Sequence, residues 1–138
     1  MDCTATHLSY RQTGAFSKIV LDYLDQSQSL TAFIKHPPSI DGLQKAIEAR
    51  KQFPTNREVL VRELKQQYGI VKASLAVQKN IDALLSPGTF TITTAHQNNI
   101  FTGPLYFIYK ILHAIKLADH LNTALPAYQF VPVYYIGS

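Results

Sequence analysis

The sequence predicts an α/β protein in which a helix-rich lead precedes one strand–helix–strand unit with parallel strands. Residues 1–88 show apolar residues at helical spacing, broken by turn signals, whereas residues 89–94 (TFTITT) are rich in β-branched and aromatic residues. A strand, a helix and a strand with short joints follow residue 88, an order that means a right-handed crossover and parallel pairing. We therefore expect a helical segment over residues 1–88, packing on the core, and a β-α-β unit over residues 89–138.

The helical lead is predicted from apolar spacing and from capping residues. Helices are expected over Ser17–Asp25, Ile40–Gln52, Arg57–Tyr68 and Ser74–Leu85, with a further helical turn at Leu30–Ile34. Ser17, Ser39 or Asp41, and Asn56 can cap the starts of the first three helices. Two buried stripes are expected: Val59, Leu60, Leu64 and Tyr68 in the third helix, and Leu75, Ile81 and Leu84 or Leu85 in the fourth.

The β-α-β unit is predicted from three segments, Thr89–Thr94, Pro104–Leu121 and Phe130–Ile136. The helix has a wide apolar arc, expected to face the sheet, with Tyr106 and Lys110 on the opposite stripe. The arc comprises Phe107, Ile108, Ile111, Leu112, Ala114, Ile115, Ala118 and Leu121. One such unit leaves two sheet edges unpaired, so we expect an incomplete sheet and the front piece of a longer protein.

Composition and charge exclude several classes of function. The chain has 138 residues, 46% of them hydrophobic and 16% charged, as in a globular domain. The net charge of +4 is not concentrated, since residues 89–138 carry two Lys/Arg and one Asp/Glu, so no nucleic-acid partner is expected. No apolar run is long enough for a membrane span, and the start lacks the apolar core of a secretion signal. The single cysteine, Cys3, fits a reducing compartment, and we expect a cytoplasmic protein.

The loop after the first predicted strand gathers the polar residues of a ligand site. His96 and Gln97 stand at the strand end, Asn99 follows, and Gly103-Pro104 begins the helix. Proline suits a first helical position, with Thr102 or Gly103 as cap, so the free N–H groups of residues 105–107 would favour an anion. Nucleotide-binding α/β proteins place their ligands at the carboxyl ends of strands, so we expect one concave pocket with anion affinity here.

Alternative interpretations of the histidines stay open. A lone loop histidine such as His96 is often structural rather than catalytic. His113 and His120 share a helical stripe, but no thiol or carboxylate beside them completes a metal site, so no metal is expected. The chain has no P-loop, no dinucleotide-binding glycine motif and no serine nucleophile elbow.

The same segment resembles the cysteine-adding enzymes of bacillithiol biosynthesis. The residues that carry the resemblance are Thr94-Ala95-His96-Gln97, Asn99, Phe101 to Phe107 (FTGPLYF), Tyr109-Lys110, Ile115 to Ala118 (IKLA) and Phe130 to Tyr134 (FVPVY). Weaker similarities extend upstream to Thr13-Gly14. The chain departs from the family pattern at Ala95, where the family has glycine, and at Tyr135, where it has tryptophan.

The resemblance implies a Rossmann-like core similar to class I aminoacyl-tRNA synthetases, with a C-terminal coiled coil and a homodimer in the full-length family. It implies a ligase that joins L-cysteine to glucosaminyl-malate using ATP or another adenine nucleotide. His96 would be the catalytic residue. The residues expected to bind nucleotide or substrate are Thr94, Gln97, Asn99, Thr102, Gly103, Tyr106 and Lys110.

Two functions from different classes remain at this point. One is the N-terminal part of the cysteine ligase, which we expect to be inactive by itself because only one side of the ligand site is encoded. The other is a non-catalytic nucleotide-binding or helical interaction module, in which Tyr10, Phe33 and Tyr68 would form a partner surface.

Overall fold

The computed structural model describes residues 4–101 and 103–137 of the chain. Cys3, Thr102 and Ser138, to which the sequence directs attention, lie outside the described residues. The chain divides into two compact units, Met1–Gln52 and Phe53–Ser138. The α-helices of residues 57–83 thus belong to the same compact unit as the β-α-β segment, whereas the domain boundary expected after residue 88 stays a prediction.

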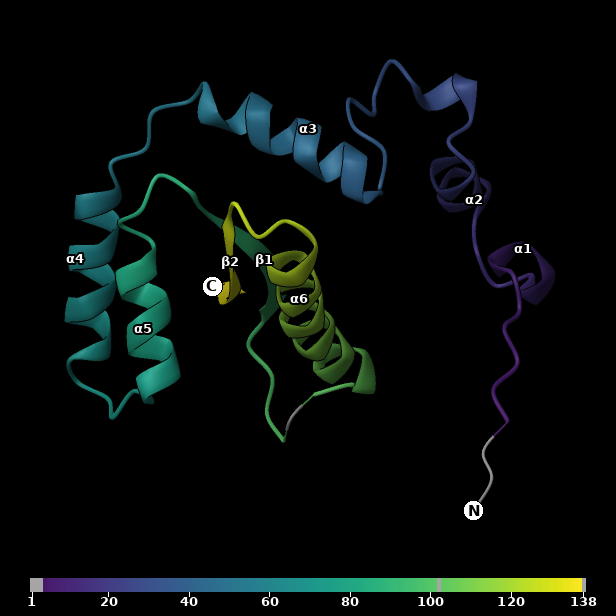
Figure 1. Ribbon diagram of the computed structural model, residues 1–138. Coiled ribbons are helices and arrows are strands. Elements are labelled where there is room, and N and C mark those ends of the chain that lie inside the picture. The colour runs from purple at the N-terminus through teal and green to yellow at the C-terminus, as the bar shows by residue number, and fades with distance from the viewer. Residues whose placement is uncertain (1–3, 102, 138) are drawn as a thin grey trace. The chain divides into compact units, whose positions relative to one another are not determined.

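The first unit contains short helices that begin at capping residues. Its elements are α1 (Tyr10–Thr13), α2 (Lys18–Leu24), a 3-10 helix (Gln28–Leu30) and α3 (Ile40–Lys51), as Figure 1 shows. Ser17 and Ser39 are the N-caps of α2 and α3, as expected, and the Ser39 hydroxyl accepts the Gly42 N–H at 3.1 Å. Helix α1 was not expected, although a capping box of Ser9 and Gln12 begins it.

In the second unit, helix α4 (Arg57–Tyr68) begins at Asn56 as expected but turns a different stripe inward. Val61 is 4% exposed, whereas Val59, Leu60 and Tyr68 are exposed and Leu64 is partly buried, so three of the four expected residues were wrong. The physical reason is Arg57, whose guanidinium donates to the carbonyls of Leu84 and Thr89 at 2.8 and 3.0 Å. Positions 57, 61 and 64 share one helical face, so this anchor turns Val61 inward.

Helix α5 (Leu75–Ala83) begins at Ser74, whose hydroxyl accepts the Val77 N–H at 3.3 Å. Ile81 and Leu84 are buried, which confirms two of the expected inward residues. Leu75 is 84% exposed, so this expectation was wrong, and of the alternatives Leu84 and Leu85 it is Leu84 that packs inward. Val77, Ile81 and Leu84 lie at successive turns on the packed face of the helix. Leu75 is in the first turn of α5, on the opposite side of the helix.

The sheet has two parallel strands, β1 (Thr89–Gln97) and β2 (Gln129–Gly137), which confirms the expected pairing. The register runs from Thr89 opposite Gln129 to Gln97 opposite Gly137. Helix α6 (Leu105–Ala124) connects the strands and contacts both of them (Figure 1). On the other face, Val131 of β2 packs with Val61, Ile81 and Leu84, so the sheet lies between α6 and the α4–α5 pair.

Helix α6 uses only part of its apolar arc for packing on the sheet. Ala114, Ala118 and Leu121 are buried, but Ile108, Leu112 and Ile115 are exposed, so the expected arc was too wide. Lys110, expected on the solvent stripe, is half-buried on the sheet side. A helix with apolar residues around most of its surface does not specify its own rotation, and the contact with the two strands decides it.

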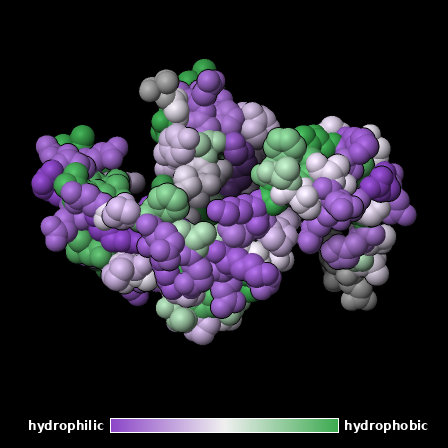
Figure 2. Space-filling view, turned by 90° about the horizontal axis from the view of Figure 1, so that it is seen from above, coloured by the Kyte–Doolittle hydropathy of each residue, from purple (hydrophilic) through white to green (hydrophobic). Residues whose placement is uncertain are grey.

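Hydrophilic residues dominate the face seen in Figure 2, and the hydrophobic side chains on it form separate groups. Exposed apolar residues of this kind are common on folded chains and do not by themselves mark a site. Within residues 4–101 and 103–137, none of the helices combines the length and apolar character that a bilayer crossing requires.

Candidate functional site

The loop between β1 and α6 turns through two left-handed backbone positions, Phe101 (φ 52°) and Gly103 (φ 63°). A Cβ at Gly103 would lie 2.8 Å from Cγ of Asn99, so glycine is required both by the backbone and by this close approach. The Gly103 N–H donates to the Ile100 carbonyl at 3.2 Å. At Gly103 the backbone of the loop therefore passes close to the side chain of Asn99.

The start of α6 corrects two expectations. Pro104 is the N-cap residue, in extended conformation, rather than the first helical residue, and neither Thr102 nor Gly103 holds that position. The Phe107 N–H donates to the Pro104 carbonyl at 2.9 Å, so it is not available to an anion. Because proline has no side-chain acceptor, the N-cap does not bond the amides of Leu105 and Tyr106.

His96, Asn99 and Tyr106 form one hydrogen-bonded cluster at the carboxyl end of β1. Nε2 of His96 lies 2.8 Å from the Tyr106 hydroxyl. Nδ1 of His96 lies 2.7 Å from Nδ2 of Asn99 and 2.9 Å from the carbonyl oxygen of Gln97. Nδ2 of Asn99 also donates to that carbonyl at 2.9 Å. The imidazole is thus held from both of its nitrogens.

Aromatic contacts fix the plane of the imidazole. The Phe107 ring meets it edge-on, with centroids 5.6 Å apart and an interplanar angle of 87°. Phe107 in turn meets Tyr134 of β2 edge-on, with centroids 5.5 Å apart. Phe107 was expected only as part of the apolar arc. Its position in the first turn of the helix that follows the histidine loop is the signal that could have identified it.

Lys110 folds back to the same end of the sheet, as a binding role would require. Its ammonium donates to the carbonyl oxygen of Ala95 at 2.6 Å, in a part-buried position beside His96. Among the described residues, no carboxylate forms an ion pair with Lys110. An ammonium without a carboxylate partner attracts an anion, and this one has further N–H groups to donate.

The structure does not bring every candidate residue into this cluster. Thr94 lies on the same face of β1 as His96, two residues earlier, and its partner on the neighbouring strand is Tyr134. The hydrogen bonds of His96 do not include Thr94. Gln97 contributes its backbone carbonyl, while its side chain points to the other face of the strand. The concave pocket expected around His96 stays a prediction, as do the roles of the individual candidate residues.

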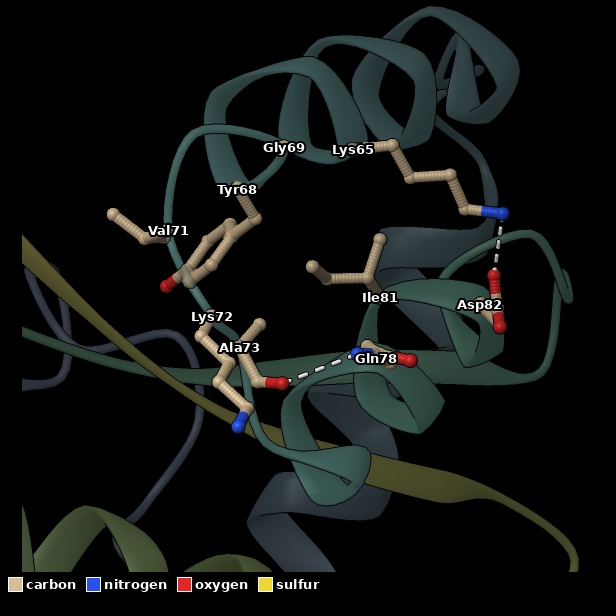
Figure 3. Close-up of a pocket in the computed structure, with 9 residues that line it drawn as sticks. All are labelled: Lys65, Tyr68, Gly69, Val71, Lys72, Ala73, Gln78, Ile81 and Asp82. Atoms are coloured by element: carbon tan, nitrogen blue, oxygen red, sulfur yellow. Dashed lines mark hydrogen bonds and ion pairs between the residues drawn. The ribbon is translucent and has the colours of Figure 1, made fainter.

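A second feature, a hollow of about 410 Å³, lies at the connection between α4 and α5 (Figure 3). Tyr68, Val71 and Ile81 form apolar walls, and Lys65 pairs with Asp82 at 2.6 Å at one side. The Gln78 amide donates to the Ala73 carbonyl at 3.1 Å, as the dashed line in Figure 3 marks. These two polar pairs satisfy each other, whereas the ammonium of Lys72, which also lines the hollow, has no hydrogen-bond or ion-pair partner among the described residues.

The described part of the chain offers no cluster of side chains that could bind a metal ion. Within residues 4–101 and 103–137, no three His, Cys, Asp or Glu side chains stand close enough to share an ion. The polar side chains at the carboxyl end of β1 are an imidazole, an amide, a tyrosine hydroxyl and one ammonium, and the ammonium favours an anionic organic ligand.

Comparison with known proteins gives a consistent result over the whole chain. Residues 1–138 match the family model described as bacillithiol biosynthesis BshC, N-terminal Rossmann-like domain. The chain is 44% identical over 133 residues to the "Putative cysteine ligase BshC" of Flavobacterium johnsoniae, covering 95% of this chain and 25% of that protein. The protein of the same name from Cytophaga hutchinsonii is 46% identical over 131 residues, again with 95% and 25% coverage.

A more distant relative of the same name, from Chlorobaculum tepidum, is 35% identical over 130 residues, which are 89% of this chain and 23% of that protein. The chain thus spans about a quarter of the length of these relatives. The parallel β-α-β unit, the histidine loop at its carboxyl end and the match over residues 1–138 agree. The chain belongs to the BshC family of bacillithiol biosynthesis and corresponds to its N-terminal Rossmann-like domain.

Proposed function

We propose that this chain forms the nucleotide-binding part of a ligase that joins L-cysteine to glucosaminyl-malate using ATP. The observation that carries the proposal is the cluster of His96, Asn99, Tyr106 and Lys110 at the carboxyl end of the parallel strands. Parallel α/β sheets bind nucleotides at this end, where the loops after the strands lie together. The name of the relatives supports cysteine as a substrate, and the resemblance in the histidine loop supports the sugar.

The chemistry of the cluster suits the phosphate groups of ATP. Activation of a carboxyl group by ATP develops negative charge on phosphate oxygens, which hydrogen-bond donors and cations stabilise. Lys110 supplies an ammonium and Tyr106 a hydroxyl, and the positive end of the α6 dipole lies beside them. In this proposal His96 acts at the nucleotide phosphates, and recognition of cysteine and of glucosaminyl-malate requires other parts of the full-length protein.

The wider properties of the full-length protein are also proposals. The coiled coil and the homodimer rest on the family resemblance alone. Because the chain spans a quarter of its relatives, we expect it to give no product above background when incubated with ATP, cysteine and glucosaminyl-malate. One side of a site cannot align two substrates and a nucleotide.

A binding experiment and a turnover experiment test the proposal together. ATP is titrated into the chain by calorimetry, and His96→Ala is expected to weaken binding by tenfold or more, about 1.4 kcal/mol. His120→Ala is the matched control, because His120 is an exposed histidine about one turn before the end of α6. Unchanged affinity in His96→Ala would reduce the histidine to a structural residue.

For turnover, the chain replaces the matching N-terminal part of the Flavobacterium johnsoniae relative, and product is measured with and without His96→Ala. Cysteine-dependent product that falls tenfold or more in the variant supports the ligase. ATP binding by the chain, together with full activity of the His96→Ala chimera, would instead favour a non-catalytic nucleotide-binding module.

A further inference from the structure

The hollow at the connection between α4 and α5 has a backbone that hydrogen bonds fix in place. The Val71 N–H donates to the Tyr68 carbonyl at 3.1 Å, and the Ala73 N–H donates to the Val71 carbonyl at 2.9 Å. The side-chain amide of Gln78, in the first turn of α5, donates to the Ala73 carbonyl at 3.1 Å. Because the connection is bonded at both of its ends, a ligand would not have to order it on binding.

The walls of the hollow suit a molecule with an apolar body. Gly69 and Ala73 line it with little or no side chain, which leaves the space open. In Figure 3 the ring of Tyr68 and the side chain of Ile81 lie on either side of that space. Tyr68 and Val71 are 38% and 56% exposed, so a ligand that covered them would remove apolar surface from water. The volume of about 410 Å³ is within the range of about 300–1,000 Å³ that is usual for small-molecule pockets.

The charged side chains that line the hollow leave one positive charge uncompensated. They are two lysines and one aspartate, and Lys65 pairs with Asp82 at 2.6 Å. Figure 3 shows Lys72 across the hollow from that pair. Within residues 4–101 and 103–137, neither the Lys72 ammonium nor the Tyr68 hydroxyl has a hydrogen-bond partner. An ammonium of this kind attracts an anion, and the single free charge favours a ligand with a single anionic group.

We propose that this hollow is a binding site for a small organic acid, a molecule with an apolar body and one carboxylate. The apolar body lies between Tyr68 and Ile81, and the carboxylate accepts a charge-assisted hydrogen bond from Lys72. A nucleoside triphosphate carries several negative charges, which one free lysine does not balance. The site is independent of the ATP-binding role proposed for the His96 cluster, because the sheet lies between α6 and the α4–α5 pair.

A pair of compounds that differ only in charge tests the proposal on the chain. The probe is 3-phenylpropionate, which has an apolar ring and one carboxylate, and its uncharged analogue is 3-phenylpropanamide. Each is titrated into the chain and followed by the NMR resonances of the backbone amides. The acid is expected to bind about threefold or more tightly than the amide, the scale of an exposed ion pair. Residues 68–73 and 78–82 are expected to shift most, and high salt should reduce the preference for the acid.

Lys72→Met removes the ammonium and keeps the side-chain stem. It is expected to weaken binding of the acid by about threefold or more and to leave binding of the amide unchanged. Lys79→Met is the matched control, because Lys79 is an exposed lysine of α5 outside the hollow and its replacement removes the same charge. Its affinity for the acid is expected to equal that of the wild type.

Val71→Asp tests the apolar wall, since it removes an apolar contact and places a negative charge beside the expected carboxylate. It is expected to weaken binding of the acid more than Lys72→Met does. Ile70→Asp is the control, because Ile70 is the preceding residue, is 89% exposed and does not line the hollow. Both positions are exposed, so both variants are expected to melt close to the wild-type temperature.

Four results would overturn the proposal. One is a wild-type chain that binds neither compound or binds both equally, and another is unchanged affinity for the acid in Lys72→Met. A third is equal weakening by Ile70→Asp and Val71→Asp, because the effect would then come from net charge rather than from the hollow. The fourth is a set of shifted resonances confined to residues 95–110, since the acid would then bind at the carboxyl end of β1.

Discussion

At the amino end of the β1–β2 sheet, side chains bind the backbone groups of buried residues, whereas at the carboxyl end the side chains of His96 and Tyr106 bind each other at an exposed position. Asn122 donates to the Phe130 carbonyl and accepts the Phe130 N–H, at 3.0 and 2.7 Å. Arg57 donates to the Thr89 carbonyl, and Thr89 and Phe130 are both buried. His96 and Tyr106, at the other end, are half-buried and exposed.

This difference indicates that the two ends have different tasks. Groups that satisfy buried backbone at the amino end contribute to stability, because an unpaired buried N–H or C=O is costly. Side chains that are accessible at the carboxyl end contribute little to stability but are free to meet a ligand. Substitutions at the two ends should therefore separate into those that change unfolding and those that change binding.

The largest effect on stability is expected at Leu121, which is 0% exposed near the amino end of the sheet. Leu121→Ala removes buried methyl groups and leaves a cavity, so the free energy of unfolding should fall by about 2–5 kcal/mol. Urea unfolding of the chain measures it. Leu112→Ala on the same helix is the control, since Leu112 is 51% exposed and its replacement should cost less than about 1 kcal/mol. Equal losses would contradict the packing described for α6.

Asn122→Ala is expected to lower the free energy of unfolding by about 1–3 kcal/mol, because it leaves both backbone groups of Phe130 without their side-chain partner. Thr123→Ala is the neighbouring control. The Thr123 hydroxyl donates only to the Asp119 carbonyl within the exposed part of its own helix, so its loss should cost about 0.5 kcal/mol or less. A Thr123 effect as large as that of Asn122 would show that the clamp at Phe130 does not stabilise the sheet.

Gly103→Ala tests the connection between loop geometry and the carboxyl-end cluster. The left-handed backbone should cost about 1–2 kcal/mol of stability, and the new Cβ must displace Asn99. Gly14→Ala is the matched control, since Gly14 has the same φ of 63° and nothing within 4 Å of the added carbon. Both variants should lose stability, but only Gly103→Ala should weaken ATP binding and shift the His96 resonances. If the two variants had the same ATP affinity and the same His96 resonances, the position of Asn99 would have no effect on the site.

The smallest effect on stability is expected for Lys110→Met, which keeps the side-chain stem and removes the ammonium. Loss of the bond to the Ala95 carbonyl should cost about 0.5–1.5 kcal/mol. ATP affinity should fall more strongly, and the loss should shrink at high salt because the ammonium acts through charge. Lys116→Met serves as the control, being an exposed lysine further along α6. If ATP affinity survives Lys110→Met, the ammonium has only a structural role.

Local signals in the sequence determined where most elements begin and which type they are. Ser39, Asn56 and Ser74 each begin a helix by accepting an N–H three residues later, a contact that depends only on neighbours in the chain. The break at residues 86–88 and the β-branched run after it likewise placed β1, and the short joints to α6 and β2 required parallel strands. The histidine loop and its candidate residues were visible in the same way, from their order along the chain.

Which helix faces pack, and which site residues meet, depends on contacts between segments that are far apart in the sequence. Val61 rather than Val59 is buried because Arg57 reaches the carbonyls of Leu84 and Thr89, 27 and 32 residues further along. Lys110 faces the sheet because two strands cover only part of an apolar helix. His96 meets Tyr106 because the loop returns through Gly103, and a contact across such a turn depends on positions in space that residue spacing alone does not contain.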